Sequence, residues 1–157
     1  MNSRLPSATI VLGAAGALAF AALAFAALSR TGPVATHLTT WLVAYGAVVL
    51  SFLGAVHWGL VLAAEQPQRP WLRAGFGVLP ALAGWVAVWL DITAVPAGAI
   101  GLLIAAYLGV AAVERSFYIR GWLPRGYLWL RYVLTLVVVL ILSTVLTLRL
   151  LGARITL

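Results

Sequence analysis

Few side chains in this 157-residue sequence can do chemistry, and three of them lie within or at the ends of long apolar stretches: His57, Glu114 and Arg131. Ionisable groups inside a membrane are costly to bury, so they are treated first as functional-site hypotheses. Glu114 and Arg131 belong to consecutive apolar stretches joined by one loop, so they can meet as a charge pair. The alternative is that the pair only pins two helices together, with the Arg131 side chain extended toward lipid headgroups.

The role of His57 is open between several hypotheses. It can be a buried neutral histidine that bonds a carbonyl or hydroxyl group. It can anchor a small molecule such as a quinone headgroup, with Trp58 and Phe52 as aromatic walls. It can be an axial haem ligand, although His37 lies about 30 Å away on the same predicted helix and cannot bind the same iron. Finally, His57 and Glu114 can pass a proton between them.

Other chemistry is excluded by missing residue types. The sequence has no cysteine, and all ten basic residues are arginine. Disulfides, thiolate metal sites, iron–sulfur clusters and lysine Schiff bases are therefore excluded. Three acidic residues and two histidines are a thin supply for a metal site, and none is predicted. No nucleophile elbow, zinc-protease motif or pair of carboxylates at active-site spacing occurs, so the sequence predicts a protein that is not an enzyme.

The composition is that of a membrane protein. Hydrophobic residues make up 64% of the chain and charged residues only 8%, whereas soluble domains carry about 25% charged residues. A net charge of +7 could suggest nucleic-acid binding. In so apolar a chain, arginines facing anionic headgroups explain this charge better, and no nucleic-acid partner is expected.

Five apolar stretches are each long enough to cross a bilayer, which takes about 20 helical residues. We therefore predict an all-α membrane protein with one transmembrane domain over residues 1–157. The first stretch, of about 21 residues, exceeds the ~7–15 apolar residues of a signal peptide, so we expect it to remain as a span. The predicted spans cover residues 8–28, 38–64, 71–90, 95–113 and 127–148.

The arginines predict how the chain is oriented. With the N-terminus inside, seven arginines lie on the inner side and three on the outer side, which satisfies the positive-inside rule. We therefore expect a multi-pass protein of the bacterial inner membrane with a cytoplasmic N-terminus and an external C-terminus. The inner arginines are Arg4, Arg69, Arg73, Arg115, Arg120, Arg125 and Arg131; the outer ones are Arg30, Arg149 and Arg154.

Small residues recur at helical spacing and predict close helix packing, since membrane helices associate where backbones can approach. Gly46 and Gly54 share one face of the second span with His57. Gly101 and Gly109 form a similar stripe in the fourth span. Such stripes indicate packing seams within the bundle, with an oligomer contact as the alternative. Pro80 should kink the third span because it lacks an amide hydrogen.

Three segments resemble a known family. The segment 45–59 ends in His-Trp-Gly, the segment 79–85 contains Pro80, and the segment 123–135 places an aromatic pair before Arg131. Together they resemble a family of five-helix integral membrane proteins that includes mitochondrial transmembrane protein 69. The resemblance implies a protein of an energy-transducing membrane and brings no assigned activity.

These observations lead to a functional expectation with two alternatives. We expect an accessory or assembly subunit of a larger energy-transducing membrane complex, in contact with another membrane protein or a second copy of itself. The first alternative is a binder or sensor of a quinone, haem or tetrapyrrole at an inner-leaflet pocket near His57. The second is a small proton-linked transporter.

Overall fold

The computed structural model describes residues 7–65, 69–123 and 125–152, which fold into five helices. Arg4 and Arg154, both counted in the charge asymmetry, lie outside these described residues. The helices confirm the predicted all-α fold, and each is long and apolar enough to cross a membrane. They are α1 (Ser7–Ser29), α2 (Gly32–Leu62), α3 (Pro70–Ile92), α4 (Pro96–Ile119) and α5 (Arg125–Leu150).

Two helices extend beyond the predicted spans. Helix α2 begins at Gly32 instead of residue 38, and α4 continues to Ile119 instead of ending at residue 113. The prediction followed the apolar run, whereas a helix ends where its backbone hydrogen bonds end. Pro33 fits the first turn of α2, where its missing amide hydrogen is not needed. Charged residues such as Glu114 and Arg115 are good helix formers, so they do not stop α4.

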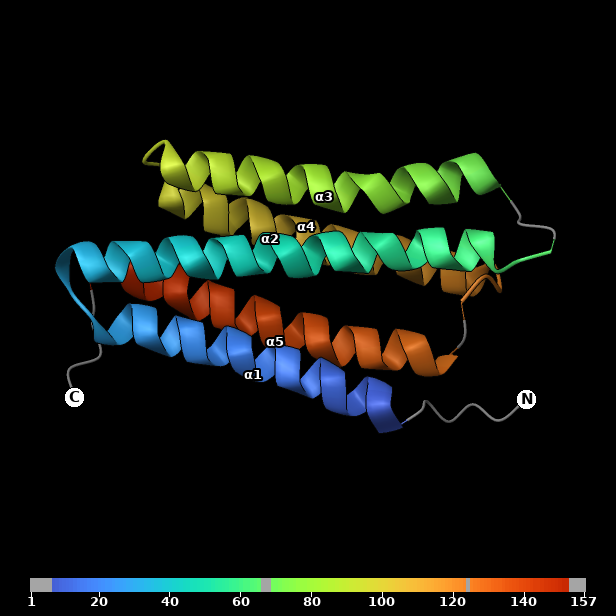
Figure 1. The fold of residues 1–157 in the computed structure, drawn as a ribbon, viewed down its shortest axis with the longest axis horizontal. Helices are drawn as coiled ribbons and strands as arrows, with labels where there is room; N and C mark the ends of the chain where they lie inside the picture. The colour runs from blue at the N-terminus through green and yellow to red at the C-terminus, as the bar shows by residue number, and fades with distance from the viewer. Residues whose placement is uncertain (1–6, 66–68, 124, 153–157) are drawn as a thin grey trace.

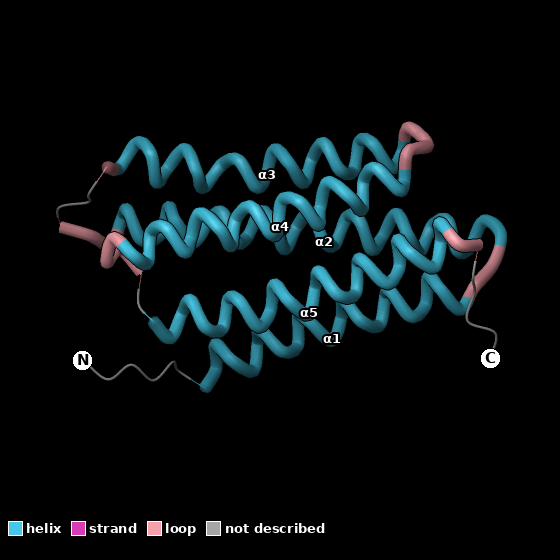
Figure 2. The backbone as a smooth tube through the Cα atoms, turned by 180° about the vertical axis from the view of Figure 1, so that it is seen from behind, coloured by secondary structure: helices cyan, strands magenta, loops and turns pink. Residues whose placement is uncertain are grey.

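Helix α2 occupies the centre of the bundle, between the pair α3 and α4 on one side and the pair α1 and α5 on the other (Figures 1 and 2). It packs against α1, α3 and α4, while α5 packs against α1 and α4. Among the described residues, the backbones of α2 and α5 do not approach closely, although Arg149 on α5 donates a hydrogen bond of 3.2 Å to the carbonyl oxygen of Ala35 on α2. This arrangement leaves a space between α1, α2 and α5 that side chains fill only in part.

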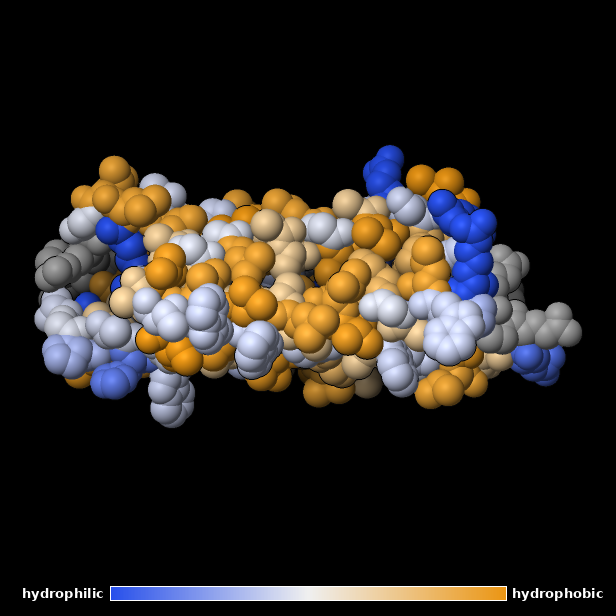
Figure 3. Space-filling view, turned by 90° about the horizontal axis from the view of Figure 1, so that it is seen from above, coloured by the Kyte–Doolittle hydropathy of each residue, from blue (hydrophilic) through white to orange (hydrophobic). Residues whose placement is uncertain are grey.

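The outer surface is apolar along the middle of the bundle and more hydrophilic at its two ends, as Figure 3 shows for one face. Large apolar side chains are exposed there, including Leu12 at 72% and Leu18 at 70%. A soluble protein does not leave such a continuous apolar surface in water. The protein is therefore a multi-pass membrane protein whose helices contact the lipid bilayer.

Glycines allow close approach of α2 to its neighbours. A Cβ atom at Gly54 would collide with the carbonyl oxygen of Gly77 on α3, and one at Gly46 would lie 3.0 Å from Leu103 on α4. The buried Pro80 lies beside Gly54, and α3 continues as one helix through it. Both glycines thus lie at helix contacts: a side chain at Gly54 would meet the backbone of α3, and one at Gly46 would require Leu103 and Phe20 to shift.

The small-residue stripe on α4, with Gly101 and Gly109, does not lie at a helix contact. A Cβ atom at Gly101 or Gly109 would meet nothing within 4 Å among the described residues. Ala105, between them, is exposed. The buried face of α4 instead carries larger side chains, such as Leu103 and Tyr107. The small-residue stripe therefore points out of the bundle. It is therefore not a packing seam within this chain.

Candidate functional site

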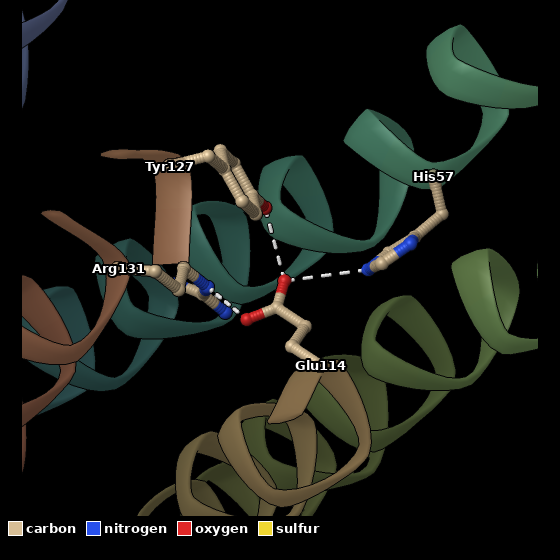
Figure 4. Close-up of polar contacts among 4 residues, drawn as sticks. All are labelled: His57, Glu114, Tyr127 and Arg131. Atoms are coloured by element: carbon tan, nitrogen blue, oxygen red, sulfur yellow. Dashed lines mark hydrogen bonds and ion pairs between the residues drawn. The ribbon is translucent and has the colours of Figure 1, made fainter. Parts of the chain in front are cut away.

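Glu114, in the last turns of α4, is the centre of a polar cluster with His57, Tyr127 and Arg131 (Figure 4). Its Oε2 lies 2.7 Å from Nε of Arg131, and its Oε1 lies 3.0 Å from the hydroxyl of Tyr127. Oε1 also lies 3.3 Å from Nε2 of His57. One carboxylate thus connects α4 with α5 and with α2.

Helical spacing explains why two side chains of α5, Tyr127 and Arg131, both contact Glu114. Tyr127 and Arg131 are four residues apart, so their side chains lie on the same face, one turn from each other. Sequence reasoning predicted the contact between Glu114 and Arg131 but missed Tyr127. The signal that could have identified Tyr127 is this four-residue spacing from Arg131, together with its place at the start of the same span.

The hydrogen-bond directions follow from the charge of Glu114. An ionised carboxylate accepts hydrogen bonds only, so Arg131, Tyr127 and His57 all act as donors. This requires a hydrogen on Nε2 of His57 and, in a neutral ring, leaves Nδ1 as an acceptor. Nδ1 is buried and has no partner among the described residues. With a neutral His57, the charges of Glu114 and Arg131 cancel.

Three of the four side chains in the cluster are buried, and Tyr127 is half-buried. His57 and Glu114 are 0% exposed and Arg131 is 3% exposed. Burying separate charges would be very unfavourable, whereas a hydrogen-bonded pair offsets much of the desolvation energy. The histidine was expected to bond a carbonyl or hydroxyl group if it were buried and neutral. Its partner is instead the Glu114 carboxylate.

Two aromatic rings pack against the His57 ring. Phe76 and Phe117 make edge contacts with its ring at centroid distances of 5.0 and 5.5 Å, and they lie 5.5 Å from each other. The Nε2 atom already contacts Glu114. His57 is thus buried between two phenylalanine rings and the Glu114 carboxylate, and its Nδ1 is buried as well.

The two aromatic residues expected beside His57 point elsewhere. Trp58 is 48% exposed and donates a hydrogen bond of 2.9 Å from Nε1 to the carbonyl oxygen of Ala74 on α3. Phe52 is 67% exposed and faces the space between α1, α2 and α5. The structure therefore does not bring Trp58, Phe52 and His57 together into one pocket.

A groove does exist, but Arg131 and not His57 lies in it. Two adjoining cavities, of about 380 and 450 Å³, open between α1, α2 and α5. We call them together the α1–α2–α5 groove. Neither cavity is lined by His57 or Glu114. The residues that line both are Leu12, Gly13, Phe52, Leu53, Arg131 and Leu134.

Two buried polar atoms on the groove lack partners. Nη2 of Arg131 and Oγ1 of Thr135 have no hydrogen-bond partner among the described residues. Their side chains are 3% and 4% exposed, and both residues line the 380 Å³ cavity. Leaving such groups unpaired is unfavourable by about 1–3 kcal/mol each. Thr9 and the tyrosines Tyr45, Tyr107 and Tyr127 also line the groove, and most of the remaining lining is apolar.

The described residues contain no group of three or more histidine, cysteine, aspartate or glutamate side chains that could hold a metal ion. Glu114 is surrounded by donors, and Arg131 is the nearest charged group. The arrangement can bind an acceptor group at the free edge of Arg131. It offers no paired acid and base with a substrate-sized opening between them.

Comparison with known proteins places the chain in a family. It is 34% identical over 84 residues to Transmembrane protein 69 of Xenopus tropicalis, a match that covers 53% of this chain and 33% of that protein. The chain thus matches about a third of the relative's length. No solved structure matches. A family model described as "Protein of unknown function (DUF3429)" matches residues 5–147. Because this match covers most of the sequence, the chain belongs to the DUF3429 family of membrane proteins.

Proposed function

We propose that this protein binds a lipid-soluble molecule in the α1–α2–α5 groove. The observation that carries the proposal is that Arg131 and Thr135 line a mainly apolar cavity, and that each has a buried donor atom without a partner among the described residues, Nη2 and Oγ1. Ligand sites typically combine a mostly apolar wall with a few polar groups that fix the ligand's orientation. The ion pair with Glu114 fixes the position of the Arg131 side chain, so its guanidinium is already oriented before a ligand binds.

The groove also suits a ligand that enters from the bilayer. Leu12 and Phe52 line it and are largely exposed on the lipid-facing surface. Apolar tails can therefore pass from lipid into the groove without crossing a polar barrier. The polar end of the ligand would lie at Arg131, within the first turns of α5. We place this end at the inner leaflet, following the arginine asymmetry.

The test is whether a lipid-soluble molecule accompanies the purified protein. The protein is purified in mild detergent, its bound lipids and lipid-soluble compounds are extracted, and each is quantified per mole of protein. We expect one compound near a 1:1 ratio. Ala17 lines the groove on α1, and Ala17→Phe should fill the space and remove that compound. Ala19→Phe, on the exposed side of the same helix, is the matched control and should retain it.

A second candidate function is that of an accessory or assembly subunit of an energy-transducing membrane complex. The observation that favours it is the outward-facing stripe of Ala97, Gly101, Ala105 and Gly109 on α4, since small residues let another helix approach closely. Under this candidate, Ala105→Leu should release a co-purifying membrane protein in mild detergent. Ala55→Leu, at an exposed position on α2, should retain it.

A further inference from the structure

We infer that the groove takes a neutral, planar ligand with two carbonyl groups and an apolar tail, which is the chemistry of a quinone. This inference rests on the proposed function and names the class of molecule bound. It follows from the charge already present at the site, from the spacing of the two free donors, and from the aromatic side chains around them.

Charge balance favours a neutral acceptor over an anion. The positive charge of Arg131 is already compensated by Glu114, whose Oε2 lies 2.7 Å from Nε. An anionic headgroup at Nη2 would leave a net negative charge in a site where both side chains are at most 3% exposed. Unpaired charge is strongly disfavoured in such surroundings. A carbonyl oxygen accepts the free N–H without changing the charge.

The spacing of Arg131 and Thr135 suits a small ring that carries two hydrogen-bond acceptors. Arg131 and Thr135 are four residues apart on α5, so their backbone positions differ by about 6 Å along the helix axis. Both line the same cavity, and each has one unpartnered atom. A ring with two carbonyls can accept from both donors at once, whereas a single hydroxyl or a single ketone leaves one donor unpaired.

The walls of the same cavity suit a planar ring. Phe20, Tyr45, Phe52 and Tyr107 line it from three helices. The hydroxyls of Tyr45 and Tyr107 are already bonded to backbone carbonyls of Gly16 and Gly46, so these residues present their rings as walls. Aromatic side chains pack favourably against another ring at offset or edge-on geometry.

The adjoining 450 Å³ cavity has room for the start of a tail. It continues from Arg131 along α1 and α5 and is lined by Ala8, Leu12, Val56 and Leu130. All four side chains are apolar, and Leu12 is 72% exposed at the surface. A tail can thus leave the groove directly into the lipid.

The experiment measures equilibrium binding of ubiquinone carrying a decyl tail to the delipidated protein in detergent. Dodecanoate, an anion, and decanol, with one hydroxyl, are compared under the same conditions. We expect the quinone to bind at 1:1 and the other two compounds to bind at least tenfold more weakly. Thr135→Val removes a donor that has no hydrogen-bond partner among the described residues, so the variant should fold normally. It should weaken quinone binding about fivefold to tenfold, the equivalent of one hydrogen bond of about 1–1.4 kcal/mol.

Two controls separate the outcomes. Thr144→Val lies on the exposed side of α5, away from the groove, and should leave quinone binding unchanged. Ala17→Phe should abolish binding of any groove ligand. The quinone inference is overturned, and the proposed function stands, if the quinone does not bind while dodecanoate or decanol does, and if Ala17→Phe abolishes that binding. If none of the three compounds binds and no lipid-soluble compound co-purifies, both are overturned.

Discussion

Glu114 joins three helices through one side chain. Its two oxygens contact Arg131 and Tyr127 on α5 and His57 on α2. The same contact that stabilises the bundle also fixes the guanidinium of Arg131 at the wall of the groove. Folding and the proposed ligand binding would therefore both depend on Glu114, and variants must be chosen so that the two effects can be told apart.

Replacing Glu114 should destabilise the fold strongly. Glu114→Gln retains the volume but leaves Arg131 as a buried cation without its counterion. Breaking a buried pair from one side typically lowers the free energy of unfolding by about 3–5 kcal/mol. Unfolding of the purified protein in detergent, followed by circular dichroism, measures the change. The matched control is Glu65→Gln, at an exposed position, which should unfold like the parent. Equal stability of the two variants would show that the pair does not hold the helices.

Replacing Tyr127 should have a smaller effect. Tyr127→Phe removes a hydrogen bond of 3.0 Å to Glu114 and leaves the ring in place. A hydrogen bond to a charged group contributes about 1.5–3 kcal/mol. The unfolding free energy should fall by that amount. Tyr132→Phe on the same helix removes a hydroxyl that has no hydrogen bond among the described residues and should have little effect. A Tyr132→Phe variant as unstable as Tyr127→Phe would contradict this assignment.

At the scale of the helices, some features were predictable from the sequence and others were not. Five long apolar runs are enough to predict five spans. The meeting of Glu114 with Arg131 followed from the single loop that joins their helices. The partner of His57 could not be predicted, because it depends on how α2 and α4 are rotated about their axes. The groove could not be predicted either, because it lies where the backbones of α2 and α5 stay apart.

The close contact between α2 and α3 predicts that adding one methyl group at Gly54 lowers the stability of the bundle. Gly54→Ala would bring a Cβ atom into collision with the backbone of Gly77, so the helices must separate. Overpacking of this kind is unfavourable by about 1–3 kcal/mol. Gly59→Ala on the same helix meets nothing within 4 Å and should stabilise the helix by up to about 1 kcal/mol. Thermal unfolding in detergent should therefore shift in opposite directions for the two variants. A shift in the same direction would mean that α2 and α3 do not approach this closely.

At the scale of the whole molecule, an odd number of spans places the start of α1 and the end of α5 at opposite ends of the bundle (Figure 1). Which end faces the cytoplasm decides where the groove opens, because Arg131 lies near the end that holds the loop between α4 and α5. The positive-inside rule predicts that this end faces the cytoplasm. The proposed headgroup site then lies in the inner leaflet.

The absence of cysteine from the chain makes this orientation directly measurable. Thr31→Cys lies between α1 and α2, and Glu65→Cys follows α2, so the two exposed positions are on opposite sides of the membrane. In intact bacterial cells, a membrane-impermeant maleimide should label Thr31→Cys and should label Glu65→Cys only after the membrane is permeabilised. Both variants should react equally in detergent, which controls for local accessibility. The reverse pattern would place the arginine-rich end outside, and the groove would then open to the outer leaflet.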